Sequence, residues 1–253
     1  MRMNGNIIDT HAHLNELDGL HSELAKARRA GIAGIIGVGM DLSSNRRILE
    51  IAEEHPGFVF PAIGYHPWEI RTAEIDATLV FLEENIDRCV AIGEVGLDYK
   101  ARVKKTLQRE VFTEIIMLAV RHKKILILHC RYSHQRVFSM ISDGAVEKAI
   151  FHWYTGSLDF LGSILDAGYF ISATPALVYS PPHQEAIRNA PLERILIETD
   201  CPVSYQGRKA GPRAIFTSLR EVARIKAMPE STIAAVTGKN ATALFGLASW
   251  GLA

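Results

Sequence analysis

The chain has 253 residues, and its 28 Lys plus Arg balance its 28 Asp plus Glu, so the formal net charge is zero. This balance excludes a protein that binds nucleic acid through a global basic field, and any phosphate recognition must be local. Hydrophobic residues make up 48% of the chain, as in globular proteins with a large core. The length suits one α/β barrel or two small domains.

The cysteines and the hydropathy pattern favour the cytoplasm. Cys89, Cys130 and Cys201 are odd in number and widely spaced, which argues against a disulfide framework. Met1–Asn6 is polar and leads directly into an apolar run, which predicts that no signal peptide is present. No apolar run approaches the ~18 residues of a membrane span. We therefore expect a cytoplasmic monomer with no membrane contact and no obligate protein partner.

Apolar, β-branched runs alternate with amphipathic stretches along the whole chain. Nearly continuous hydrophobic runs of this kind are typical of strands buried on both faces, as in a parallel sheet. The predicted strands are Ile7–Leu14, Gly34–Met40, Phe58–His66, Val90–Leu97, Ile125–Cys130, Ala149–Trp153, Tyr169–Ala173 and Ile195–Thr199. The predicted helices cover residues 20–30, 43–54, 74–87, 106–122, 133–142, 157–166, 183–190 and 212–227.

Boundary residues support this alternation. Ser157 and the pair Pro181-Pro182 stand where helices should start, and Gly31 stands where a helix should stop. Eight β/α units predict a single-domain (β/α)8 TIM-type barrel over residues 1–253. Pro229–Leu247 adds C-terminal helices that we expect to pack over the barrel. A doubly wound open sheet is the alternative.

The first predicted strand carries a possible metal-binding motif, Asp9-Thr10-His11-Ala12-His13. Side chains alternate faces along a strand, so His11 and His13 point the same way and offer two imidazoles to one divalent ion. Asp9 shares that face, where a carboxylate is expected to orient a ligating histidine. The alternative is a surface strand with two unrelated histidines.

Further polar side chains follow the other predicted strands, at the end where barrel enzymes place their active sites. Each of these residues, taken alone, has an ordinary explanation, such as a hydrogen-bonded core histidine. Their convergence on one rim instead predicts a metal site. The residues are His66, Glu94, His129, His152 and Asp200.

The set of nitrogen and oxygen ligands is larger than one catalytic ion needs, because such sites keep an open position. Two ions ~3.5–4 Å apart, bridged by a carboxylate and a water, are the economical arrangement. Glu94 lies between the two groups of ligands along the chain, and we expect it to be the bridge. Asp200 is expected to bind an ion and to accept a proton from the activated water. Gly93 and Gly96 leave room for a ligand or another backbone to approach.

Six motifs spread from the first strand to the eighth carry a family resemblance. They are Asp9–His13, Gly64–Pro67, Ile92–Tyr99, His129–Arg131, His152–Gly156 and Glu198–Asp200. Together they resemble the TatD family of metal-dependent deoxyribonucleases, which are amidohydrolase-like barrels. The resemblance implies a nuclease that cleaves phosphodiester bonds at DNA or RNA ends with a two-metal-activated water. It implies these metal ligands: His11, His13, Glu94, His129, His152 and Asp200.

Three segments depart from the family pattern, and all lie in loops expected to face the substrate. The loop after Asp200 reads Cys201-Pro-Val-Ser-Tyr-Gln-Gly-Arg-Lys209, Trp68 stands where family members often carry a histidine, and Lys100–Gln108 is shorter than usual. Rim cations are expected to hold phosphates and rim aromatics to stack on a base; a solvated rim and loop packing are the alternatives. The predicted substrate contacts are His66, Trp68, Tyr99, Arg131 and Glu198.

Two other functions remain open at the level of sequence. A deaminase or cyclic amidase on the same barrel shares the His-x-His motif, two further histidines and a terminal Asp. Many of those enzymes hold one metal or use a modified Lys where this chain has Glu94, which favours the TatD-like class. A metal-binding scaffold without turnover is the non-enzymatic alternative. The residues do not distinguish Zn, Mg, Mn, Ni or Fe, nor DNA from RNA.

Overall fold

The computed structural model describes residues 7–252, so the segment Met1–Asn6, predicted to hold no signal peptide, lies outside the described residues. Eight strands form one sheet in which every neighbouring pair is parallel and the spatial order follows the chain. The strands are β1 (Ile7–Ala12), β2 (Ile32–Val38), β3 (Val59–Ile63), β4 (Ala91–Asp98), β5 (Ile125–Arg131), β6 (Ala149–Phe151), β7 (Phe170–Ala173) and β8 (Ile195–Ile197).

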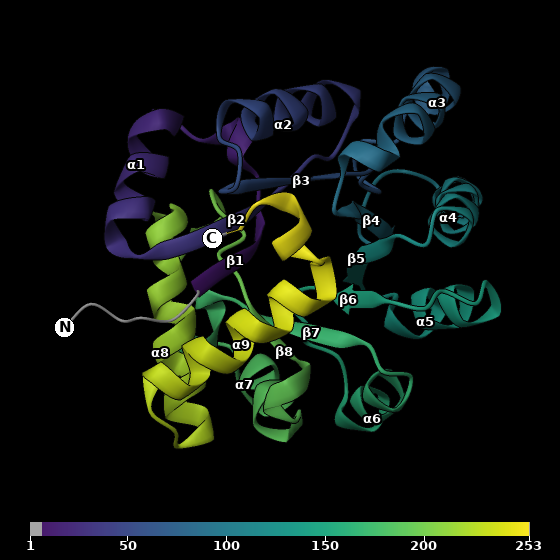
Figure 1. Cartoon of the computed structure of the whole chain (residues 1–253). Coiled ribbons are helices and arrows are strands. Elements are labelled where there is room, and N and C mark those ends of the chain that lie inside the picture. Colours follow the sequence, from purple (N-terminus) through teal and green to yellow (C-terminus); the bar gives the residue numbers. More distant parts are fainter. Residues whose placement is uncertain (1–6, 253) are drawn as a thin grey trace.

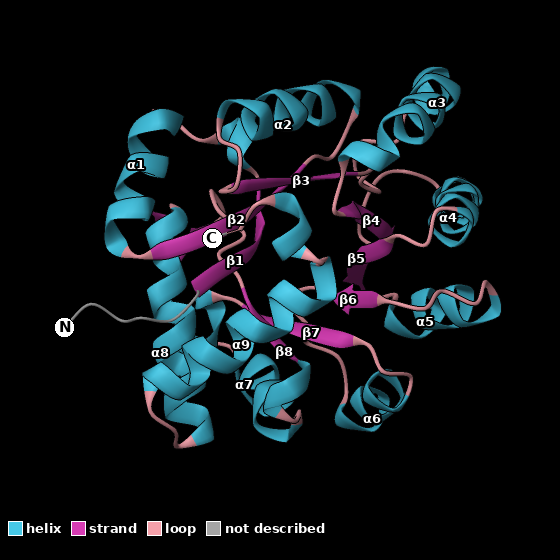
Figure 2. Cartoon of the chain, in the orientation of Figure 1, coloured by secondary structure: helices cyan, strands magenta, loops and turns pink. Residues whose placement is uncertain are grey.

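Helices surround the strands on all sides (Figures 1 and 2). The predicted (β/α)8 barrel is confirmed, and the doubly wound alternative is wrong because the strand order never reverses. The assignment of residues 1–253 to a single domain stays a prediction. The helices are α1 (Leu20–Ala30), α2 (Leu42–Glu54), α3 (Ile75–Asn85), α4 (Lys105–Arg121), α5 (His134–Asp143), α6 (Leu158–Asp166), α7 (Pro181–Asn189), α8 (Ile215–Lys226) and α9 (Glu230–Phe245).

The barrel closes between β1 and the segment that follows β8. The Asp200 amide donates to the His11 carbonyl oxygen at 2.9 Å. The Asp9 carboxylate accepts hydrogen bonds from the Thr199 amide at 2.9 Å and the Thr199 hydroxyl at 2.6 Å. The expectation that Asp9 orients a histidine ring is therefore wrong, because its carboxylate joins the two ends of the sheet. Burial raises the pKa of Asp9 to about 8 despite these hydrogen bonds.

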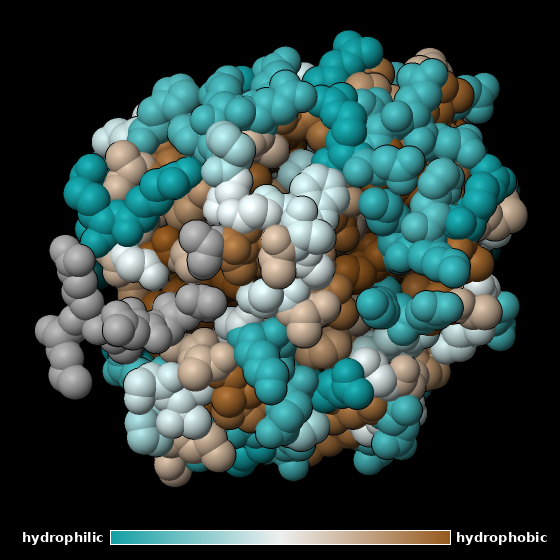
Figure 3. Space-filling model, viewed as in Figure 1, coloured by the Kyte–Doolittle hydropathy of each residue, from teal (hydrophilic) through white to brown (hydrophobic). Residues whose placement is uncertain are grey.

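Helix α9 covers the end of the barrel at which the strands begin (Figure 1). Its Leu244 and Phe245 pack with Ile8 and Phe60 in the apolar interior of the sheet. Hydrophilic residues cover much of the outer helices on this side (Figure 3). Within residues 7–252, no helix is both long enough and apolar enough to cross a bilayer. The floor of the barrel is thus closed by apolar side chains, and the polar residues gather at the opposite end.

Strand boundaries differ from the prediction at the polar end. β3, β6 and β8 stop at Ile63, Phe151 and Ile197, whereas the apolar pattern extends each by two or three residues. The chain instead turns into loops there, and Trp153 and Asp200 adopt left-handed backbone conformations, with φ of +43° and +51°. A short hairpin, β9 (Ser204–Tyr205) with β10 (Arg208–Lys209), follows β8 and was not predicted.

Candidate metal centre

Glu94 projects from β4 into the mouth of the barrel, where it is 3% exposed. Two glycines, Gly64 directly after β3 and Gly96 within β4 itself, permit this placement. A Cβ at Gly64 would lie 2.8 Å from the Glu94 amide nitrogen, and a Cβ at Gly96 would lie 2.2 Å from the His129 carbonyl oxygen. Gly96 also has φ +139°, which L side chains rarely adopt. Because neither glycine has a side chain, the Glu94 backbone packs directly against Gly64 and the His129 backbone packs directly against Gly96. This close packing brings Glu94 and His129 together.

The first group of candidate ligands comes from β1 and the loop after β8. The Nε2 atoms of His11 and His13 are 3.2 Å apart. They lie 3.3 and 3.4 Å from Glu94 Oε2, and 3.6 and 3.3 Å from Asp200 Oδ1. A tetrahedral ion with ligands at ~2.0–2.1 Å requires ligand atoms about 3.3–3.4 Å apart. These four atoms therefore match the donor set and the spacing of one divalent ion.

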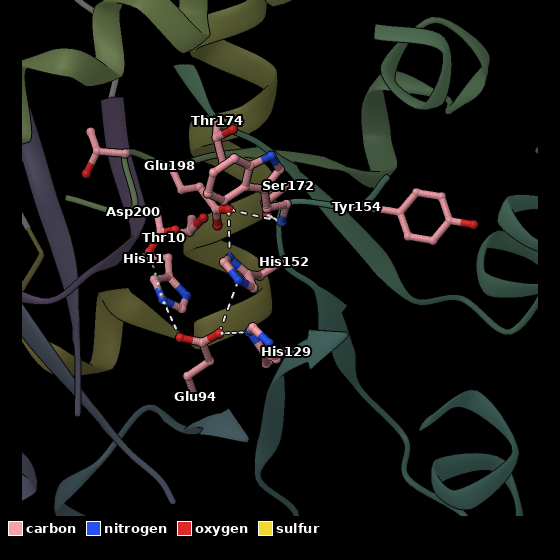
Figure 4. A network of polar contacts seen from close by, with 12 residues as sticks. Thr10, His11, Glu94, His129, His152, Tyr154, Ser172, Thr174, Glu198 and Asp200 are labelled. Carbon is pink, nitrogen blue, oxygen red and sulfur yellow. Dashed lines mark hydrogen bonds and ion pairs between the residues drawn. The ribbon is translucent and has the colours of Figure 1, made fainter. Parts of the chain in front are cut away.

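The second group surrounds the other oxygen of the same carboxylate (Figure 4). Glu94 Oε1 lies 2.7 Å from His129 Nδ1, 3.2 Å from His152 Nε2 and 3.4 Å from His66 Nε2. Each oxygen of Glu94 thus faces a separate set of imidazole nitrogens. A carboxylate in this position has the geometry of a bridge between two cations.

Buried carboxylates hold the outer nitrogens of two of these histidines. Asp98 Oδ2 lies 3.0 Å from His129 Nε2, and Glu198 Oε1 lies 3.1 Å from His152 Nδ1. Contacts of this kind fix the tautomer and orientation of a metal-binding histidine. Glu198 is 1% exposed, so this placement fits a residue that orients His152 rather than one that contacts substrate. Sequence reasoning placed Asp98 in a motif but missed this contact.

Contacts between the carboxylates and the histidines of the cluster determine their charges, because these contacts outweigh the effect of burial on most of the pKa values. Burial would raise the pKa of Glu94, but contacts with the histidines around it, His152 and His11 among them, hold it well below its ordinary value. Burial would likewise lower the pKa of His13, yet hydrogen bonds to Asp200 and Glu94 raise it to about 10. The ionised carboxylates therefore hold a proton on His13 and favour the protonated forms of His129 and His152. A divalent cation bound here replaces those protons.

His66 differs from the other histidines of the cluster. Its Nδ1 accepts a hydrogen bond from the Trp68 amide at 3.2 Å, which assigns the proton of the neutral ring to Nε2. Burial lowers the pKa of His66 to about 4, so the ring is neutral at physiological pH. Its Nε2–H then points toward Glu94, and His66 fits a hydrogen-bond donor better than a metal ligand.

A cleft of about 720 Å³ lies over the ligands. Among the predicted substrate contacts, His66, Trp68 and Arg131 line it, whereas Tyr99 lines a neighbouring hollow of about 350 Å³. Trp68 is 50% exposed, and its indole Nε1 donates to Asp98 Oδ2 at 2.6 Å. Val203 and Lys209, in the loop after Asp200 that was expected to face the substrate, also line the cleft. Sequence reasoning missed Tyr179 in the cleft wall, because nothing in its local pattern marks it.

Comparisons with known proteins agree with this geometry. The family model described as TatD related DNase matches residues 8–246. The chain is 31% identical over 253 residues to the uncharacterized metal-dependent hydrolase YabD of Bacillus subtilis, covering 94% of this chain and 98% of that protein. It is 29% identical over 245 residues to a 3′-5′ ssDNA/RNA exonuclease TatD of Edwardsiella piscicida, covering 89% of this chain and 92% of that protein.

Among solved structures, the chain resembles YjjV, a TatD homolog from Escherichia coli. The two are 25% identical with a TM-score of 0.85, and the match covers 95% of this chain and 98% of that one. The similarity in sequence and in fold thus extends over almost the whole barrel.

Proposed function

The chain belongs to the family of TatD-related DNases, and from this premise we propose that it hydrolyses phosphodiester bonds at the ends of single-stranded DNA or RNA. The observation that carries the proposal is the position of Glu94, whose two oxygens each face a separate set of histidine nitrogens. Relatives named as metal-dependent hydrolases and exonucleases support it. They do not favour the deaminase, cyclic amidase or scaffold alternatives.

Two divalent ions are part of the proposal. His11, His13 and Asp200 would hold one ion with Glu94 Oε2, and His129 and His152 would hold the other with Glu94 Oε1. When bound, such ions stabilise charge on a phosphate and make water a better nucleophile at neutral pH. The choice among Zn, Mg, Mn, Ni and Fe, the cytoplasmic location and the monomeric state stay predictions.

Asp200 is the proposed proton acceptor. Burial would raise the pKa of its carboxyl group, but His13, His11 and His152 hold it below its ordinary value, so the group is ionised at neutral pH. The carboxylate lines the cleft and can receive a proton on an oxygen during attack on the phosphate. Arg131 lines the same cleft and would orient the phosphate oxygens, and the substrate contact of His66 stays a prediction.

The shape of the site favours chain ends as substrates. The proposed ligands lie between buried strand ends, with Glu94 and Asp200 only 3% and 5% exposed. A single-stranded terminus can enter the cleft, but the middle of a rigid duplex cannot reach Glu94. The zero net charge agrees with contact to only a few phosphates, so binding should depend less steeply on salt than for a duplex binder with 6–10 such contacts.

The proposal is tested by offering metal-loaded protein three kinds of substrate. We expect shortening of end-labelled single strands and no cleavage of covalently closed circular duplex. Cleavage of the circles would contradict the dependence on ends. Ammonia release from free nucleosides with every phosphodiester left intact would assign the protein to the deaminase class. Metal-free protein and the Asp200→Asn variant serve as controls.

A further inference from the structure

The hollow of about 350 Å³ lies beside the cleft, and the loops at the ends of β5 and β6 pass from the wall of one to the wall of the other. Arg131 and Thr155 line the cleft, and the residues that follow them, Tyr132 and Gly156, line the hollow. A polymer whose end lies in the cleft would therefore pass over these two loops into the hollow. We call this second hollow the Tyr132 hollow; Tyr99 and Arg136 also line it.

Exposed cations gather around the Tyr132 hollow without acidic partners. Lys100 Nζ lies 5.2 Å from the centre of the Tyr132 ring, and Lys105 Nζ lies 4.5 Å from that of Tyr99. Within residues 7–252, none of the cations of this region forms an ion pair, whereas six arginines on other parts of the surface each pair with a glutamate. The unpaired cations are Arg136 in the wall of the hollow, Lys100 and Lys105 beside its two tyrosines, Arg102 and Lys104 in the segment between these lysines, and Arg131 in the wall of the cleft.

Tyr132 itself is unusual on two counts. Its side chain is 70% exposed, and its backbone has φ +57°, a left-handed conformation that bulky residues rarely adopt. Because the ring is exposed, no burial of apolar surface offsets the energetic cost of this backbone conformation. An exposed aromatic ring among unpaired cations is the arrangement that single-strand-binding proteins use, with bases stacked on the ring and phosphates held by the cations.

We propose that the Tyr132 hollow is a second binding subsite for single-stranded nucleic acid, holding nucleotides that lie away from the cleaved end. A base stacks on Tyr132, and Arg136 and the cations of 100–105 neutralise the adjacent phosphates. This inference rests on the proposed function, because it names the path of the same polymer beyond the metal centre. A short diester that fills only the cleft does not reach the subsite.

The test measures binding and hydrolysis separately. Binding of a fluorescein-labelled single-stranded octanucleotide to metal-free protein is followed by anisotropy, and hydrolysis of bis(p-nitrophenyl) phosphate is followed with metal-loaded protein. We expect Tyr132→Ala to weaken octanucleotide binding about tenfold and Tyr132→Phe to bind like wild type. Arg136→Gln should reduce the slope of log K against log salt by about 0.7. Arg29→Gln removes an exposed arginine in the last turn of α1, at the opposite end of the barrel, and should change neither quantity.

All four variants should hydrolyse the small diester at the wild-type rate. Wild-type octanucleotide affinity in Tyr132→Ala, or equal losses in Arg136→Gln and Arg29→Gln, would overturn the subsite. If no variant or wild-type protein hydrolyses the diester but the binding pattern holds, the proposed function fails and the subsite stands. If the diester is hydrolysed and the binding pattern is absent, the subsite alone fails.

Discussion

The proposed metal centre has two halves that share Glu94 but hold their histidines by different means. In the β1 half, made of His11, His13 and Asp200, His13 Nδ1 faces the main-chain carbonyl of Val38 at 3.1 Å. In the β5–β6 half, made of His129 and His152, the outer ring nitrogens face the carboxylates of Asp98 and Glu198. The first half depends on backbone geometry, and the second depends on buried charge.

This difference predicts which substitutions should weaken metal binding in each half. A carboxylate beside a ligating imidazole orients the ring and raises its basicity, so the β5–β6 half should respond to changes in side chains outside the ligand set. The β1 half offers no such carboxylate among residues 7–252 and should respond to changes in its own ligands and in Glu94.

Glu94→Gln should give the largest effect, because it removes the charge that both halves share. We expect a loss of activity of at least about 10⁴-fold, because metal binding and the activation of water by general-base catalysis both depend on the Glu94 carboxylate. Elemental analysis should show fewer than two ions per chain after reconstitution. Activity that saturates at one ion per chain, with Glu94→Gln unaffected, would contradict the shared bridge.

Asp200→Asn removes a proposed ligand of the β1 half alone and should cost less. The substitution keeps the shape but removes the proton acceptor, and we expect kcat to fall 10²–10⁴-fold while KM changes little. Metal content must be measured together with the rate, because weaker metal binding would also lower kcat. A fully metallated Asp200→Asn protein with a near-normal rate would remove Asp200 from the proton-transfer role.

Asp98→Asn tests the β5–β6 half without touching a ligand. The variant weakens the contact to His129 Nε2, and we expect metal affinity in this half to fall about 10- to 100-fold. A titration of metal-free protein should show one weakened binding phase and one unchanged phase. Asp76→Asn, at an exposed site in the first turn of α3, is the matched control. An equal loss in both phases would show that the halves are not independent.

The pH dependence of metal affinity should be a smaller effect and should appear in both halves, because neighbouring carboxylates also raise the pKa values of His129 and His152 against the effect of burial. Asp200 and Glu94 raise the pKa of His13 from 6.5 to about 10, so an ion entering the β1 half displaces a proton at any pH below that value. Affinity there should rise about tenfold per pH unit between pH 6.5 and 8.5. Calorimetry in buffers of different ionisation enthalpy measures the released protons, and no release at pH 7.5 would contradict this account.

The same shift has a consequence for the metal-free fold. A histidine whose folded pKa lies above its unfolded value of 6.5 stabilises the fold in full below pH 6.5, and this contribution is lost as the pH rises through about 10. The melting temperature of the metal-free protein should therefore fall more between pH 7 and pH 10 than that of the metal-free His13→Gln variant.

Sequence reasoning predicted the barrel and the convergence of the site because both follow from short-range patterns. Runs such as Ile125–Leu128 are apolar because both faces of a barrel strand are buried, and strand ends then place His129 and His152 on one rim. The partners of Asp9 and Asp98 were not predictable in this way. Asp9 meets Thr199, 190 positions away, and Asp98 meets His129, 31 positions away, and such contacts depend on how the barrel closes.

The most direct test of the shared bridge is an anomalous difference map from crystals of metal-reconstituted protein, recorded at the absorption edge of the bound metal. The account predicts two peaks, one on each side of the Glu94 carboxylate and about 3.5–4 Å apart. One peak should be contacted by His11, His13 and Asp200, and the other by His129 and His152. A single peak at full activity, or peaks away from Glu94, would contradict it.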